Sequence, residues 1–326
     1  MLTHGLHPRD LHVIIPYFNP FRWESRRRLH REFMAWVTGF GATVYVVELV
    51  LGDRAFEVTS GNAHELQVRT PREVPWCKEN LINMAYRKLL PKDARYMAWI
   101  DGDVIFENQN WVMDTLHELQ HAPVVQMFSE CMDLGPSSQA VPQERGSQDF
   151  VRHSFIKAWN NKVYHQGKKF NPADPYEHSH CGYAWAADLR FLRMVDQFNP
   201  LFDCSLVGSA DWIMACCFVG MPGHAAHGQA SAGYKRRVAM FAHWCNTRLQ
   251  GNVSHVPGFL LHKWHGKKKD RRYLTRWQIV TEQQFDPDLD LEYRADGLLV
   301  FSGRNPKLPL LLRSHSNAKN EDSVDT

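Results

Sequence analysis

Two acidic residues, Asp101 and Asp103, stand one residue apart directly after the apolar run 96–100. Apolar residues resume at Val104, so the two carboxylates interrupt a stretch that otherwise reads as buried. Like charges close together repel each other, and burying them without a partner costs free energy. A divalent cation that also carries a phosphate-bearing substrate would resolve both problems. The alternative interpretation is a tight turn, which Asp-Gly sequences favour.

The elements around this pair determine where it lies. The sequence predicts, in order, a strand at 13–18, a helix at 22–38, strands at 42–51 and 65–69, a helix at 75–90, and the strand that ends at the acidic pair. This alternation is typical of a parallel α/β sheet, which binds ligands at the carboxyl ends of its strands. Asp101 and Asp103 follow such an end, which favours a functional site over a turn.

The second half of the chain has a less regular pattern. We expect a helix at 111–121, a strand at 124–130, an irregular loop at 134–178, helices at 181–198, 211–219 and 274–285, and a strand at 257–261. A loop as long as 134–178 is usually functional or mobile. The polar stretch 314–326 has no apolar anchor and is expected to be a disordered tail.

Composition limits the class of protein. The 326 residues are 44% hydrophobic, and no apolar run reaches the length of a membrane span, so membrane insertion is not expected. The first residues lack the apolar core of a signal peptide, which predicts a cytoplasmic protein. Seven cysteines without a repeated spacing favour reduced thiols. A net charge of +3 is too small to indicate a nucleic-acid partner, although basic residues cluster at 26–28, 235–237 and 267–269.

Seven short motifs carry a resemblance to a known family. They are the strand 13–18, Glu48 in the second strand, the helix start 76–83, the acidic pair 101–103, and the segments 182–187, 208–211 and 262–266. In this order they resemble the GT-A-fold glycosyltransferases that use nucleotide sugars. The resemblance implies an α/β, Rossmann-type, mainly parallel sheet flanked by helices. It also implies one domain over 10–300, with a nucleotide-binding half at about 10–110 and an acceptor half at about 111–300.

The resemblance implies a metal site. Asp103 would bind Mn²⁺ or Mg²⁺ on the donor diphosphate, and Asp101 would contact the donor ribose or sugar. The metal would act as a Lewis acid on the leaving diphosphate. His265, or failing that His262, would complete the metal shell, and imidazole suits Mn²⁺ better than Mg²⁺. Two exposed histidines in a turn are the alternative.

Further donor contacts follow from the same resemblance. Glu48 would bind the base or ribose of the nucleotide, and Lys78 and Asn80 occupy the segment that approaches the nucleobase. Lys268 and Arg272 would neutralise donor phosphates or an anionic acceptor, with a UDP-sugar as the expected donor. A helix start near residue 75 explains Lys78 and Asn80 nearly as well, and charge runs such as 267–272 are usually solvated loops.

Asp211 is the candidate catalytic residue. The family places the carboxylate of inverting hexosyl transfer at a comparable helix start, where it would deprotonate the acceptor hydroxyl. A helix N-cap is the alternative for Asp211. Trp185 would stack on the acceptor sugar, and a place in the core is its alternative.

The acceptor stays open at this stage. The segment after His262 most resembles glycosyltransferases encoded by bacteriophages, some of which modify hydroxymethylated bases in DNA. That resemblance implies DNA as a possible acceptor and the host cytoplasm as the location. Transfer to a polysaccharide or lipid-linked glycan, a nucleotidyltransferase, and a non-catalytic sugar- or nucleic-acid-binding module are the alternatives.

Overall fold

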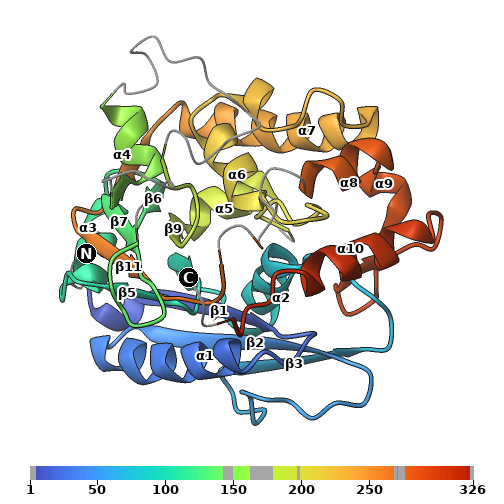
Figure 1. Cartoon of the computed structure of the whole chain (residues 1–326). Helices are drawn as coiled ribbons and strands as arrows, with labels where there is room; N and C mark the ends of the chain where they lie inside the picture. Colours follow the sequence, from blue (N-terminus) through green and yellow to red (C-terminus); the bar gives the residue numbers. More distant parts are fainter. Residues whose placement is uncertain are drawn as a thin grey trace.

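The computed structural model of the chain describes residues 5–141, 150–161, 179–196, 199–267, 270 and 276–323. A seven-stranded sheet runs through the centre with helices on both faces (Figure 1). Its strands, in spatial order, are β10 (Val253–His255), β6 (Val124–Gln126), β9 (Ala184–Asp188), β4 (Tyr96–Ile100), β1 (Leu11–Phe18), β2 (Thr43–Leu51) and β3 (Glu65–Thr70). Neighbouring strands are parallel except where β9 pairs with β4 and β6. The predicted mainly parallel α/β fold is confirmed.

Both faces of this sheet are covered, which explains its continuous apolar strands. Side chains alternate across the strand, so Val13 and Ile15 pack in one core while Ile14 packs in the other. The first core lies with α1 (Glu24–Val37) and α3 (Trp111–Glu118). The second is larger and contains residues of α2 (Lys78–Leu89), α5 (Leu189–Val195), α6 (Ala210–Phe218) and α7 (Ala232–Leu249). In Figure 1, α1 lies below the sheet and α2 above it.

A second sheet of four strands stands beside the carboxyl end of β4. Its order is β5 (Val104–Phe106), β11 (Phe259–His262), β7 (Glu130–Asp133) and β8 (Val151–His153). The described part of the chain is completed by α4 (Phe155–Asn160), α8 (Arg276–Glu282), α9 (Pro287–Asp290), the hairpin of β12 (Leu291–Tyr293) and β13 (Leu299–Phe301), and α10 (Lys307–Asn317). Short 3₁₀ helices lie at Pro8–Asp10, Thr38–Phe40 and Pro222–His224.

Several sequence predictions for the second half were wrong. The expected helix at 181–198 begins as β9, because its apolar residues lie between β4 and β6 in the sheet and leave only α5 helical. The expected irregular loop at 134–178 contains β8 and α4, whose Phe155 and Ile156 are buried. Residues 142–149 and 162–178 of that loop lie outside the described residues.

The expectation of a disordered tail was wrong for residues 314–323. Residues 314–317 belong to α10, and the side chain of Glu321 is only 3% exposed. The prediction failed because what fixes this polar segment is a set of distant partners, including Arg26, rather than apolar residues of its own. All seven cysteines are buried and free of disulfides. None of the helices in the described part of the chain combines the length and apolar character that a bilayer crossing requires.

Candidate active site

A cavity of about 250 Å³ lies where β1 and β4 end. Chain segments far apart in sequence contribute to its wall. Six of the residues singled out from the sequence line it: Lys78, Asp101, Asp103, Asp211, His262 and His265. The structure therefore brings together the acidic pair, the candidate base and both late histidines.

Strand pairing brings the first three ligand candidates together. Asp103 immediately precedes β5, and β5 pairs with β11 so that Val104 lies opposite His262. The amide of Lys263 donates a hydrogen bond to the Asp103 carbonyl at 2.8 Å. The register of the second sheet thus fixes His262 next to Asp103, and the short turn after β11 returns His265 to the same place.

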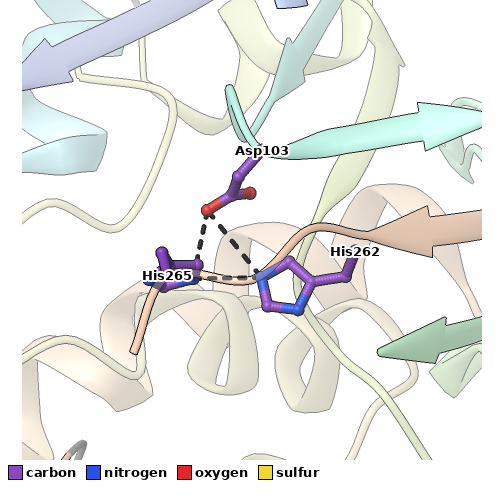
Figure 2. Close-up of side chains that lie close together, drawn as sticks. All are labelled: Asp103, His262 and His265. Atoms are coloured by element: carbon purple, nitrogen blue, oxygen red, sulfur yellow. Dashed lines mark hydrogen bonds and ion pairs between the residues drawn. The ribbon is translucent and has the colours of Figure 1, made fainter. Parts of the chain in front are cut away.

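The side chains of Asp103, His262 and His265 point toward one another (Figure 2). The Asp103 Oδ2 atom lies 3.2 Å from His265 Nε2 and 3.8 Å from His262 Nε2, and the two Nε2 atoms are 3.1 Å apart. Adjacent ligands in an octahedral shell of small divalent cations stand about 3 Å apart. One carboxylate oxygen and two imidazole nitrogens in this arrangement fit Mn²⁺ or Mg²⁺, and the nitrogens favour Mn²⁺.

His262 is oriented by a second carboxylate. Its Nδ1 lies 2.6 Å from Asp133 Oδ1, which also accepts a hydrogen bond from the Tyr183 hydroxyl at 2.8 Å. Metal-binding histidines commonly donate their other ring nitrogen to a carboxylate in this way. Burial alone would lower the pKa of His262, but Asp103 and Asp133 outweigh it and raise the pKa to about 9. At neutral pH a metal ion therefore has to displace a proton from this ring.

Lys78, the first residue of α2, joins two of the cavity carboxylates. Its Nζ lies 2.8 Å from Asp211 Oδ2, 3.1 Å from Asp101 Oδ1 and 3.6 Å from Glu79 Oε1. Burial would lower the pKa of Lys78, but the surrounding carboxylates raise it, so the amine stays charged. Burial raises the pKa of Asp101 to about 6, Lys78 opposes the rise, and Asp211 adds to it. The lysine holds two like charges a few ångströms apart.

Asp211 is not a helix cap. Ser209 holds the N-cap position of α6, without a side-chain cap bond, while Asp211 lies in the first turn and bonds to Lys78. Its second oxygen, Oδ1, is buried with no hydrogen-bond partner among the described residues. Ser209 and Tyr183, which line the cavity, both have a φ of 77°. Positive φ in non-glycine residues and unpaired buried oxygens gather at functional sites.

Three predicted site residues lie elsewhere. The Glu48 carboxylate is fully buried and accepts hydrogen bonds from the amides of residues 57–59, so it anchors a loop instead of lining the cavity. Asn80 is fully buried and bonds to Asp203, Gly297 and Leu299. Trp185 is 1% exposed, lies in β9 and donates to the Cys181 carbonyl, so it belongs to the core. None of these three side chains lines the cavity, so the structure does not bring them together with the other predicted site residues. Lys268 and Arg272 lie outside the described residues.

Sequence reasoning missed other residues of this site. Arg26, His180, Arg276 and Glu321 also line the cavity, and Asp133 lies behind His262. In the sequence, Arg26 is one residue of a basic cluster, and Glu321 is one residue of a polar tail. Their pairing spans almost the whole chain, so no local pattern reports it. The one feature of the sequence that could have pointed to this pair is Arg26 itself, because it is a cation eight residues after the end of the first strand.

Comparison with models of protein families gave no match, and comparison with curated proteins gave none either. Solved structures of similar fold exist. A Drosophila β-1,4-galactosyltransferase 7 mutant in complex with manganese, UDP-Gal and xylobiose has 11% identity, covering 89% of this chain and 91% of that chain, with a TM-score of 0.39.

Two bacterial proteins are also similar to this chain. Mannosyl-3-phosphoglycerate synthase from Rubrobacter xylanophilus has 11% identity over 89% of this chain and 84% of that chain, with a TM-score of 0.35. The 4-diphosphocytidyl-2C-methyl-D-erythritol synthase from Anaerococcus prevotii has 10% identity over 77% of this chain and 88% of that chain, with a TM-score of 0.32. All these scores are below 0.5, so activity has to be inferred from the residues of the site.

The buried acid Glu79 gives a test of the electrostatics beside Lys78. Burial raises the pKa of Glu79 to about 8, so its carboxyl stays protonated in the native state at neutral pH while it ionises in the unfolded chain. The stability that this group contributes is full at low pH and is lost as pH rises toward 8. Glu79→Gln should therefore raise the melting temperature more at pH 8 than at pH 5, by at least about 2 °C.

Thermal unfolding followed by circular dichroism at both pH values measures this difference. The matched control is Glu282→Gln, which changes an exposed acid on α8. It should give equal shifts at the two pH values. An equal shift for Glu79→Gln would mean that Glu79 is ionised in the native protein.

Proposed function

We propose that this chain is a metal-dependent glycosyltransferase that moves a sugar from a nucleotide-sugar donor to an acceptor hydroxyl. The observation that carries the proposal is that one cavity contains three side chains placed to bind one metal ion and a pair of aspartates bridged by Lys78. A nucleoside diphosphate is the anionic leaving group that such a metal stabilises. A base separate from the metal ligands suits attack by a neutral hydroxyl.

The first role of the site is to hold the donor. Asp103, His262 and His265 would bind Mn²⁺ or Mg²⁺, which when bound supplies Lewis-acid stabilisation of the leaving diphosphate. Asp101 would accept hydrogen bonds from hydroxyls of the donor ribose or sugar. With Asp101 and Asp211 both held by Lys78, the donor sugar would be placed between the metal ligands and the base.

The second role is to activate the acceptor. Asp211 takes the proton of the acceptor hydroxyl while the oxygen of that hydroxyl attacks the anomeric carbon. The bond from that carbon to the diphosphate oxygen breaks, and attack from the opposite face inverts the anomeric configuration. Lys78 keeps its proton throughout and holds the Asp211 carboxylate toward the cavity.

The acceptor is proposed only as a hydroxyl. DNA would need a cationic track for its backbone. Within the basic cluster 26–28, each arginine pairs with a glutamate of this chain, and Arg236 and Arg237 both pair with Asp288. These pairs reduce the charge that two of the three clusters would offer to phosphates. Hydroxyls of sugars and glycans are therefore favoured over DNA as the acceptor.

The direct test incubates the protein with UDP- and GDP-sugars and measures release of nucleoside diphosphate. We expect release with Mn²⁺ from at least one donor, slow hydrolysis without acceptor, and none after chelation by EDTA. A non-catalytic binding module would bind the donor without release. A nucleotidyltransferase would instead release pyrophosphate from a nucleoside triphosphate, and either result would overturn the proposal.

A further inference from the structure

The C-terminal segment, defined here as residues 318–323, lies against the candidate metal ligands. The Trp264 indole donates a hydrogen bond to the Ser323 carbonyl at 2.8 Å. Gly266 has a φ of 91°, and a Cβ at this position would stand 2.9 Å from the Asn320 carbonyl oxygen. The segment is therefore packed directly on the turn that carries His265.

The same segment is tied to the start of α1. The amides of Glu24 and Ser25 donate to the Asp322 carboxylate at 3.0 and 2.8 Å. These are the amides that a helix N-terminus leaves without partners inside the helix, so Asp322 caps α1. The cap fixes the place of the neighbouring Glu321.

The side chain of Glu321 reaches into the site. Its Oε2 lies 2.5 Å from Arg26 Nε and its Oε1 lies 2.7 Å from a terminal nitrogen of the same guanidinium. Oε2 is also 3.8 Å from His265 Nδ1, an ion-pair distance rather than a hydrogen bond. The other ring nitrogen, Nε2, faces Asp103. Glu321 thus lies behind His265, on the side away from the metal position.

Arg26 holds this carboxylate firmly in place. A further guanidinium nitrogen donates to the Phe18 carbonyl at 2.9 Å, at the end of β1. The guanidinium also stacks 5.3 Å from the ring centres of Trp23 and Trp76. A bidentate pair with a guanidinium fixed on three sides is a rigid support.

We propose that Glu321 is a positioning residue for the metal site. This inference rests on the proposed function. Glu321 faces the His265 ring from behind at ion-pair distance, and Asp133 is hydrogen-bonded to the His262 ring from its own side. Each histidine is then oriented by a carboxylate from a different part of the chain. Loss of such a carboxylate typically weakens metal affinity 10–100-fold.

The test measures Mn²⁺ affinity by the electron paramagnetic resonance signal of free Mn²⁺, without nucleotide. Glu321→Gln should weaken binding by about 10–100-fold. The matched control is Asp322→Asn, which changes an acid in the same segment that caps α1 and does not contact His265. It should lower the melting temperature, because asparagine replaces one of the two oxygens that accept the Glu24 and Ser25 amides with a donor, but leave the Mn²⁺ dissociation constant within about twofold.

Each outcome has one meaning. Unchanged Mn²⁺ affinity in Glu321→Gln overturns the inference, and so does an equal loss in both variants, which would make the segment merely structural. If Glu321→Gln does not fold, Glu321→Asp keeps the charge and withdraws it by one methylene, and unchanged affinity in that variant overturns the inference. Absence of saturable Mn²⁺ binding by the wild-type protein would overturn both the inference and the proposed metal dependence.

Discussion

Replacing Asp103 with asparagine is expected to lower sugar transfer by about 10³-fold or more. Asp103 supplies the one anionic ligand in the cluster with His262 and His265, and an amide oxygen binds a hard divalent cation far more weakly. Stabilisation of a leaving diphosphate by a metal amounts to several kcal/mol, and each 1.36 kcal/mol is a factor of ten in rate. Steady-state transfer assays with saturating Mn²⁺ measure the loss.

A thermal shift assay separates this effect from misfolding. Wild-type protein should gain melting temperature when Mn²⁺ and a nucleoside diphosphate are added together, because a ligand that binds only the native state stabilises it. Asp103→Asn should lose that gain and keep its unliganded melting temperature close to the wild-type value. Asp93→Asn, an exposed acid before β4, serves as the control and should behave like wild type. A full Mn²⁺-dependent gain in Asp103→Asn would exclude Asp103 as a ligand.

Asp211→Asn is expected to lower transfer by about 10²–10⁴-fold while donor binding survives. Asparagine keeps the shape of the side chain and can still accept a hydrogen bond from Lys78, but it cannot take a proton from the acceptor. Asp211 makes no cap bond in α6, so the substitution removes no helix cap. Measuring both turnover and the donor dissociation constant distinguishes loss of the base from loss of donor binding.

The stereochemistry of the product tests the same role independently. Nuclear magnetic resonance of the anomeric proton should show inversion relative to the donor. Retention would contradict the role of Asp211 as a base in a single displacement. Nearly normal turnover in Asp211→Asn would reduce this residue to a partner of Lys78.

The half of the fold that follows a strong local pattern could be predicted from the sequence. Continuous apolar segments such as those of β1 and β4 predict a buried parallel sheet, and the acidic pair that follows β4 marks the carboxyl end of that strand. Strand β9 could not be predicted in this way. Its alanines and Trp185 fit a helix as well as a strand, and pairing with β4 and β6 decides between them.

The candidate site shows the same division. Asp103 and His262 could be proposed from motif order, and their convergence depends on the register of β5 against β11. Glu48 shows why a lone acid in an apolar strand misleads: its carboxylate accepts hydrogen bonds from the amides of one loop. Glu321 could not be found from the sequence because its partner Arg26 lies at the other end of the chain. The assigned roles of the site residues stay predictions.

The most direct test of metal-dependent nucleotide binding is a calorimetric titration of UDP, and of GDP in parallel, with and without Mn²⁺. For at least one nucleotide, Mn²⁺ should tighten binding by at least about tenfold, and the nucleotide should tighten Mn²⁺ binding by the same factor, since coupling is reciprocal. Asp103→Asn should remove this coupling. Equal nucleotide affinities with Mn²⁺ and with EDTA, or no binding of either nucleotide, would contradict the account.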